Sequence, residues 1–372
     1  MSGIKEVKQK RAKRKRQQKI RLLVLLLLVL LLCIGLVTGV RHLFSKWKES
    51  RQTSQETIET TQSTPSVPKG NPVTLTISSM GDCTLGTDEY FDPSTSLNAY
   101  YHLYGPDYFF QNVRPILEKD DLSIVNMEGT LTDSSERQEK TYAFKAPAEY
   151  AAILSDSSVE AANLANNHSA DYGSQSQTDT INALEEKGVA TFGFDRVKIL
   201  DIKGIKVGIT GIYELAEHMG KSDQVIENIS ALKEDGAQLI IVNFHWGIEK
   251  EYTPNDTQIQ LAHLAINNGA DLVIGHHPHV LQGIEQYKGK YIAYSLGNFC
   301  FGGNSNPSDK DTLIVQQTFT FQSGELEKSS DLNLIPCSIS SSKDYNDYCP
   351  TPLEGDDKQR VLDNVKQYSN NL

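Results

Sequence analysis

Apolar residues recur along the chain with two different periods, and the switches between those periods predict strands that alternate with helices. Strands are predicted at residues 73–79, 122–126, 159–164, 197–202, 205–213, 239–244, 272–274, 291–295 and 313–321. Helices are predicted at residues 108–118, 148–155, 176–186, 225–234 and 255–268. This order predicts an α/β domain with a largely parallel sheet, helices outside it and a β-rich second half.

A different pattern occupies residues 22–40, where 19 consecutive residues carry no charge. A helix of that length, at about 1.5 Å per residue, matches the roughly 30 Å hydrocarbon core of a bilayer. Ten Lys or Arg residues precede the stretch and four follow it within a dozen residues. The positive-inside rule therefore predicts a cytoplasmic N-terminus and an extracellular main domain. A cleaved signal peptide is the alternative, although its apolar stretch is usually about 7–15 residues and ends at a small-residue site.

The linker after this anchor is rich in Ser, Thr, Gln and Pro and lacks apolar periodicity, which is typical of a solvated stalk. The predicted parts are a basic cytoplasmic tail at 1–21, a transmembrane anchor at 22–40, an extracellular linker at 41–72, a folded domain at 73–340 and a C-terminal tail at 341–372.

Composition and charge narrow the classes of function. With 38% hydrophobic and 22% charged residues, the chain is not a disordered or collagen-like protein. The net charge of -11 divides unevenly: residues 1–51 carry 14 basic and 2 acidic residues, so the remainder has 36 - 14 = 22 basic and 47 - 2 = 45 acidic residues, a net of -23. An acidic main domain excludes nucleic acid as an expected partner, because nucleic-acid binding needs a basic surface.

Four cysteines lie beyond the anchor, and they allow three complete disulfide pairings. Cys337 and Cys349 bracket a polar loop and could pair with each other. The chain contains no CxxC motif, which argues against a thiolate zinc site.

Polar residues of the types that bind metals follow the predicted strands. They are Asp82, Glu128, Asn167, His168, His245, His277 and His279. Carboxyl ends of strands in an open α/β sheet meet in one crevice, so these segments are expected to converge. Carboxylate, amide and imidazole ligands together suit one or two divalent metals such as Zn, Fe or Mn. Bound cations would activate water and stabilise developing negative charge.

Five segments resemble, in order, the motifs of the CapA family of capsule-synthesis proteins. They are residues 81–86 (GDCTLG), 126–132 (NMEGTLT), 164–173 (LANNHSADYG), 245–249 (HWGIE) and 269–299 (GADLVIGHHPHVLQGIEQYKGKYIAYSLGNF). The resemblance covers roughly residues 75–301. It implies a four-layer αββα sandwich of the calcineurin-like metallophosphatase type, preceded by one transmembrane helix. It also implies a place at the cell membrane of a Gram-positive bacterium, with a capsule or cell-wall polymer and membrane synthase subunits as partners.

The resemblance assigns roles to individual residues. It gives Asp82, Glu128, Asn167, His245, His277 and His279 as ligands of divalent metal ions, one or two in number and of unknown identity. Glu128 stands where the superfamily has a bridging Asp, and His276 offers a competing register for the final His-x-His pair. His168 corresponds to the histidine that protonates the leaving group. Thr84 stands where the first motif of the superfamily has a metal-binding His, so one metal position lacks a donor.

Neighbouring residues have two interpretations each. Asp171, three residues after His168, either orients that imidazole or caps a helix. Glu249 either contacts substrate or supports His245 from outside the metal shell.

Three hypotheses of function follow. The first is a metal-dependent hydrolase or transferase that acts in synthesis, transfer or anchoring of a poly-γ-glutamate-type polymer. The second is a non-catalytic, polymer-binding accessory subunit of a synthase complex, which Thr84 favours. The third is an extracellular metallophosphoesterase. The acidic main domain counts against an acidic polymer unless metals or local Lys clusters reverse the field.

Overall fold

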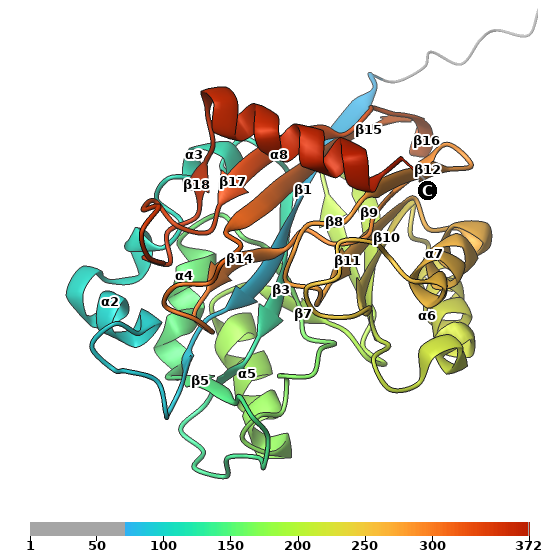
Figure 1. Cartoon of the computed structure of the whole chain (residues 1–372). Helices are drawn as coiled ribbons and strands as arrows, with labels where there is room; N and C mark the ends of the chain where they lie inside the picture. Colours follow the sequence, from blue (N-terminus) through green and yellow to red (C-terminus); the bar gives the residue numbers. More distant parts are fainter. Residues whose placement is uncertain (1–70, 371) are drawn as a thin grey trace, which may run out of the picture. The chain divides into compact units, whose positions relative to one another are not determined.

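The computed structural model of the protein describes residues 71–370 and 372, which form two large β-sheets with helices on their outer faces (Figure 1). The predicted cytoplasmic tail, the predicted anchor at 22–40 and residues 41–70 of the linker lie outside the described residues. Within 71–370 and 372, no helix combines the length and apolar character needed to cross a bilayer.

The first sheet has the strand order β18-β17-β15-β1-β3-β6-β7, with β14 paired to β1 and β16 paired to β15. Its strands are β1 (Val73–Thr84), β3 (Leu122–Glu128), β6 (Ala161–Asn163), β7 (Ala190–Phe192), β14 (Asn298–Phe301), β15 (Asp311–Gln322), β16 (Glu325–Ser329), β17 (Asn333–Ser338) and β18 (Thr351–Pro352). Strands β1, β3, β6 and β7 are parallel, whereas β15 runs antiparallel to β1. The parallel half of the sheet therefore brings several carboxyl ends to one edge.

The second sheet has the order β12-β13-β11-β10-β9-β8. Its strands are β8 (Lys198–Ile202), β9 (Ile205–Tyr213), β10 (Leu239–His245), β11 (Leu272–His276), β12 (Ile284–Tyr287) and β13 (Lys290–Ala293). Strands β9, β10, β11 and β13 are parallel, and β8 and β9 form an antiparallel hairpin. A small third sheet joins β2 (Thr87–Asp88), β5 (Phe144–Ala146) and β4 (Thr130–Leu131).

The α-helices are α2 (Leu97–Tyr104), α3 (Arg114–Leu117), α4 (Ala152–Ser155), α5 (Ser174–Glu186), α6 (Ser222–Glu234), α7 (Asp256–Asn268) and α8 (Gly355–Tyr368). Short 3₁₀ turns occur at η1 (Pro106–Tyr108), η2 (Ala148–Ala151) and η3 (His218–Lys221). Helix α7 begins with a capping box, in which Asn255 and Gln258 exchange hydrogen bonds that satisfy free backbone N–H groups.

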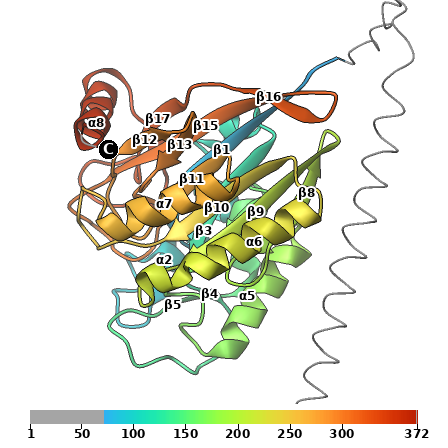
Figure 2. The ribbon, with the colours of Figure 1, turned by 90° about the vertical axis from the view of Figure 1, so that its right-hand side faces the viewer.

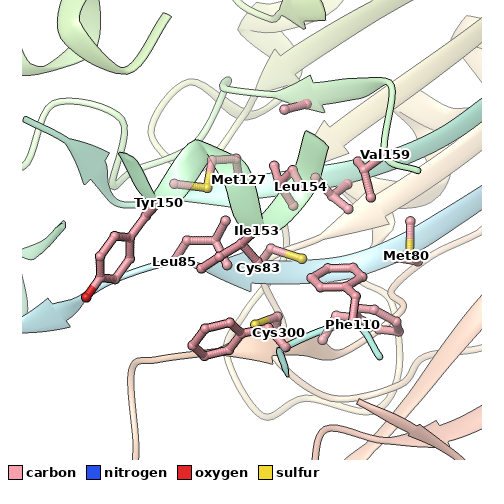
Figure 3. Packing of buried hydrophobic residues seen from close by; sticks show 14 of the residues in the cluster. Met80, Cys83, Leu85, Phe110, Met127, Tyr150, Ile153, Leu154, Val159 and Cys300 are labelled. Carbon is pink, nitrogen blue, oxygen red and sulfur yellow. The ribbon is translucent and has the colours of Figure 1, made fainter. Parts of the chain in front are cut away.

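Three apolar clusters separate four layers of structure. One lies between the first sheet and helices α3, α4 and α5, and Figure 3 shows part of it around Cys83, Phe110 and Ile153. A second lies between the inner faces of the two sheets. A third lies under α6 and α7, which cover the outer face of the second sheet (Figure 2). The layers thus follow the order helix, sheet, sheet, helix.

Several boundaries differ from the sequence prediction. Residues 108–118 form only η1 and the short α3 rather than one helix. Residues 341–372, predicted as a tail, form β18 and α8, and α8 buries Val361 and Val365 in the cluster between the sheets. This segment therefore belongs to the folded domain. The four cysteines of the described chain are buried and free, so Cys337 and Cys349 do not pair in this structure.

Candidate metal centre

The candidate centre lies where the carboxyl ends of the parallel strands of both sheets meet. Asp82 lies near the end of β1, Glu128 ends β3, and His245 ends β10. All three side chains are buried, and one ligand atom of each lies within 4.8 Å of the others. Parallel strands direct their carboxyl ends to a common edge, which explains how segments distant in sequence contribute to one site.

The side-chain amide of Asn126 in β3 links these three residues. Its Nδ2 lies 2.8 Å from Asp82 Oδ1 and 3.2 Å from Glu128 Oε1. It also lies 3.3 Å from His245 Nδ1. The other end of the amide, Oδ1, accepts a hydrogen bond of 2.9 Å from Asn163 Nδ2. Because only the NH₂ group can donate to carboxylates, this network fixes the orientation of Asn126 and the spacing of the cluster.

A second branch comes from the loop after β6. Asn167 Oδ1 lies 2.8 Å from His245 Nε2, which places this amide oxygen at the edge of the buried cluster. The neighbouring His168 directs Nδ1 toward Asp171 Oδ2 at 2.8 Å. Asp171 also accepts hydrogen bonds from Phe144 N at 2.6 Å and from Lys140 Nζ at 2.7 Å. The carboxylate of Asp171 therefore orients His168, and it does not cap a helix, because α5 begins at Ser174 and has no side-chain cap.

A second group of ligand atoms comes from Glu249, His277 and His279, again within 4.8 Å of one another. Glu249 is exposed, whereas His277 is buried and its Nδ1 has no hydrogen-bond partner in the described part of the chain. His279 Nδ1 lies 3.2 Å from Asp82 Oδ2, so the two groups are adjacent. His277 (φ 95°) and His279 (φ 57°) both adopt left-handed backbone conformations, a strain that is typical of functional sites.

Close backbone packing holds Asp82 in place. A Cβ added to Gly81 would lie 2.1 Å from the carbonyl oxygen of Gly297, so only glycine fits there. The backbone N–H of Asp82 donates to the same carbonyl oxygen at 2.9 Å. The next residue along, Asn298, begins β14 and places Oδ1 2.9 Å from His279 Nδ1.

Burial and mutual repulsion shift the pKa values of the cluster. Burial and the negative charge of Asp82 together raise the pKa of Glu128 to about 8. Burial also opposes ionisation of Asp82, but hydrogen bonds from two imidazoles hold its pKa well below the usual value. Burial lowers the pKa of His277 to about 4 and that of His245 well below the usual range. Against the effect of burial, the charges of Glu128 and Asp82 raise the pKa of His279 to about 9.

These properties fit a divalent cation. Two buried carboxylates destabilise each other unless a positive charge lies between them. His245 and His277 are neutral, so their ring nitrogens have lone pairs to offer, and Nδ1 of His277 lacks any other partner. Mixed carboxylate, imidazole and amide ligands match the preferences of Zn, Fe and Mn.

Thr84 and His276 are the two residues whose roles the motifs left open. Thr84 Oγ1 donates to Glu128 Oε2 at 3.5 Å, so it supports a predicted ligand from the side. His276 ends β11 with Nδ1 3.5 Å from Asp82 Oδ1 and Nε2 3.3 Å from Asn243 Oδ1. His276 therefore lies between Asp82 and Asn243, whereas His277 and His279 lie beside Glu249. This arrangement favours His277 and His279 as the two histidines of the final His-x-His pair.

Sequence reasoning missed the contributions of Asn126 and Lys140, and it placed Glu249 outside the ligand shell. Asn126 had a usable signal, since an amide between Val125 and Met127 in a buried strand needs a polar partner. Lys140 had none, because it lies in an irregular segment, yet its Nζ also donates to Asn167 O at 2.9 Å.

Comparison with known proteins adds an independent finding. Residues 76–303 match the family described as "Bacterial capsule synthesis protein PGA_cap". The chain is 32% identical over 268 residues to the "Capsule biosynthesis protein CapA" of Bacillus anthracis, across 65% of this chain and 63% of that protein. It is 30% identical over 267 residues to the "PGA biosynthesis protein CapA" of Bacillus subtilis, across 65% of this chain and 67% of that protein. The chain thus spans about two thirds of the length of these relatives.

Among solved structures, a 5'-nucleotidase from Candida albicans is similar with a TM-score of 0.41 and 13% identity, across 78% of this chain and 57% of that chain. Superposition at that level is too low to compare individual residues.

Proposed function

The chain belongs to the bacterial capsule synthesis protein family, and from this premise we propose that it acts in the synthesis, transfer or anchoring of a poly-γ-glutamate-type capsule polymer outside the cell membrane. Residues 22–40 would anchor the chain, with the N-terminus in the cytoplasm and the folded domain outside. Membrane synthase subunits are the partners that this placement favours.

One observation carries the chemical part of the proposal: Asp82, Glu128 and His245 converge from separate strands into one buried group. The amide of Asn126 that joins the two carboxylates is uncharged, and the cationic ring of His279 contacts Asp82 at 3.2 Å. A bound divalent cation would supply Lewis acidity to an amide carbonyl or phosphoryl group. Asn167, His277 and His279 would complete its ligands.

His168 has the position of a proton donor to a leaving group. Its Nδ1 is held by Asp171, which leaves Nε2 as the ring nitrogen available for proton transfer. Burial lowers the pKa of His168, although Asp171 opposes the shift, so the imidazolium releases its proton readily. Lys140 pairs with Asp171 and keeps that carboxylate in place.

Thr84 supports a second candidate function, a non-catalytic subunit that binds and guides the polymer. A hydroxyl 3.5 Å from Glu128 is a weaker metal ligand than the imidazole that the family resemblance predicts there. A cation at this site would then bind the carboxylates of the polymer without catalysing a reaction. Its positive charge would overcome the repulsion expected between the acidic domain and an acidic polymer.

Metal analysis and capsule assays separate these candidates. We expect the purified full-length chain to retain about one or two equivalents of Mn, Fe or Zn after dialysis. We expect cells carrying His168→Gln to lose capsule, while the exposed-residue control His102→Gln keeps it. Absence of bound metal from the unaltered chain would refute the metal centre. Bound metal together with normal capsule in His168→Gln would favour the binding role.

The membrane placement has a separate test. Protease added to intact, wall-stripped cells should digest the folded domain and leave the N-terminal tail protected. A domain that resists digestion until the cells are lysed would refute the extracellular assignment.

A further inference from the structure

A cleft of about 350 Å³ opens between residues 90–96, Tyr142, residues 303–305 and Tyr348. Its volume falls within the range of small-ligand sites and accommodates about one or two sugar rings. Tyr90 is 76% exposed and Tyr142 is 52% exposed, so two aromatic side chains are available to a ligand. Phe91 and the carboxylate of Asp92 also line the cleft.

Two aromatic residues connect this cleft to the centre. Tyr142 stacks on Phe144 with ring centroids 6.3 Å apart, and Phe144 packs against His168 at 4.7 Å. A Cβ added to Gly303 would lie 2.6 Å from Phe301 and 3.2 Å from Phe144. Phe301 in turn lies 5.7 Å from the His279 ring. The cleft is therefore one side chain away from both the predicted proton donor and a predicted metal ligand.

The chemistry of the lining is unusual for a site that receives an acidic polymer. None of the described residues that line the cleft is a Lys or Arg, and Asp92 carries a negative charge. Arg137 lies over the Tyr90 ring at 4.8 Å, but its Nη2 pairs with Asp88 at 2.8 Å. A polyanion would find no unpaired positive charge there.

We propose that this cleft binds a neutral glycan segment and positions it next to the candidate centre. Aromatic faces carry negative charge density that attracts the polarised C–H groups of a sugar ring. Amide, hydroxyl and carboxylate groups from Asn304, Ser305 and Asp92 match sugar hydroxyls. The proposal rests on the proposed function, in that the glycan would be the acceptor or carrier to which the capsule polymer is brought.

The experiment measures binding of an N-acetylglucosamine tetrasaccharide to the purified full-length chain by calorimetry and saturation-transfer NMR. We expect Tyr90→Ala and Tyr142→Ala each to weaken binding about tenfold, because each removes one stacking face. Tyr104→Ala is the matched control, since Tyr104 is 55% exposed but does not line the cleft, and it should bind normally. If a tyrosine variant unfolds, Ser305→Trp serves instead. Ser305 is exposed in the cleft, so a tryptophan there should fill the cleft and block saccharide binding.

Three results would overturn the proposal. The first is no saccharide binding by the unaltered chain at millimolar concentration. The second is equal binding by Tyr142→Ala and Tyr104→Ala. The third is binding of a γ-linked glutamate oligomer in the cleft that Tyr142→Ala abolishes. Performing each titration with and without chelator keeps the result distinct from the proposed function, because stacking in the cleft needs no metal.

Discussion

Strand β3 carries carboxylates at both of its ends, but the two ends surround them with different partners. At the amino end, Asp120 accepts a hydrogen bond from Ser123 Oγ at 2.8 Å, and Asp121 pairs with Lys203 Nζ at 2.6 Å. At the carboxyl end, Glu128 lies beside Asp82 and His245 in a buried cluster. Hydroxyl and ammonium partners satisfy the acids of the first end within the protein.

The difference shows which acids at the ends of a strand serve structure and which indicate a ligand. The amino-end carboxylates have donors of their own and need nothing from outside. The carboxyl-end pair shares one uncharged amide, and the imidazoles of His245 and His277 beside it are neutral, so among these side chains only His279 brings a positive charge. Burial of an acid therefore carries little functional information until its partners are known.

Replacing His245 should have the largest effect on metal binding at the carboxyl end of β3. His245→Ala removes a predicted ligand and leaves the two carboxylates without it, so we expect metal affinity to fall about a hundredfold or more. Calorimetric titration with Mn or Zn measures the change. His102→Ala, an exposed histidine of α2, should bind metal like the unaltered chain. Unchanged affinity in His245→Ala would show that the cluster does not hold the cation.

Removing the amide that both carboxylates share should have the next largest effect. Asn126→Ala leaves several buried groups unpaired, which costs about 1–3 kcal/mol of folding free energy, and it should weaken metal binding roughly 10–100-fold. Urea denaturation and metal titration measure the two effects. Asn228→Ala removes another buried amide, which donates to Thr210 Oγ1 at 2.8 Å, and should lose stability while keeping metal affinity. Equal metal affinity in the two variants would contradict the positioning role of Asn126.

Glu249 tests whether the carboxyl end holds one cation or two. Glu249→Gln should weaken a second equivalent of metal about tenfold and leave the first unchanged, because only the group with His277 and His279 loses a charged ligand. Metal stoichiometry by mass spectrometry reports the outcome. Glu251→Gln alters an exposed neighbour and should change nothing. Loss of both equivalents in Glu249→Gln would mean that the two groups form a single site.

The smallest effect is expected at the amino end of β3, where the contribution of Asp120 to folding stability depends on pH. Burial raises the pKa of Asp120 from 3.8 to about 6, so the folded state binds a proton more tightly than the unfolded state. The resulting stabilisation is fully present below about pH 4 and is lost as pH rises through about 6. Asp120→Asn should remove this slope, with a gain of about 1 kcal/mol at pH 8 after solvent screening. The measurement compares urea midpoints of the unaltered chain and Asp120→Asn across pH in metal-free buffer. An unchanged slope in the variant would show that another group causes the pH dependence.

The sequence indicated which side chains converge better than it indicated where strands and helices begin and end. Asp82 was expected after a strand that ends at residue 79, but β1 continues to Thr84 because β3 and, on its other side, β14 both pair with its last residues. The pairing with β14 joins segments more than two hundred residues apart, and no local pattern indicates it. Helix α8 was missed because the segment is predominantly polar, although Val361, Val365 and Tyr368 recur at helical spacing.

The ligand types were predictable because chemistry restricts them, and their partners were not. Carboxylates and imidazoles at strand ends are visible in any α/β sequence. Glu249 lies in a loop, where an acid is ordinary, so only its position beside His277 and His279 marks it as a ligand. Lys140 acts through Asp171 from an irregular segment, and sequence periodicity says nothing about such a contact.

The joint between Gly81 and Gly297 has an evolutionary consequence. A side chain at position 81 would displace the carbonyl oxygen of Gly297, and with it Asn298 and its contact to His279. A substitution at either glycine would therefore disturb both Asp82 and Asn298, which contact the loop that carries His277 and His279. We expect natural relatives either to keep both glycines or to lose them together with the residues of the candidate metal centre. A survey of diverged genomes can count how often each combination is inherited.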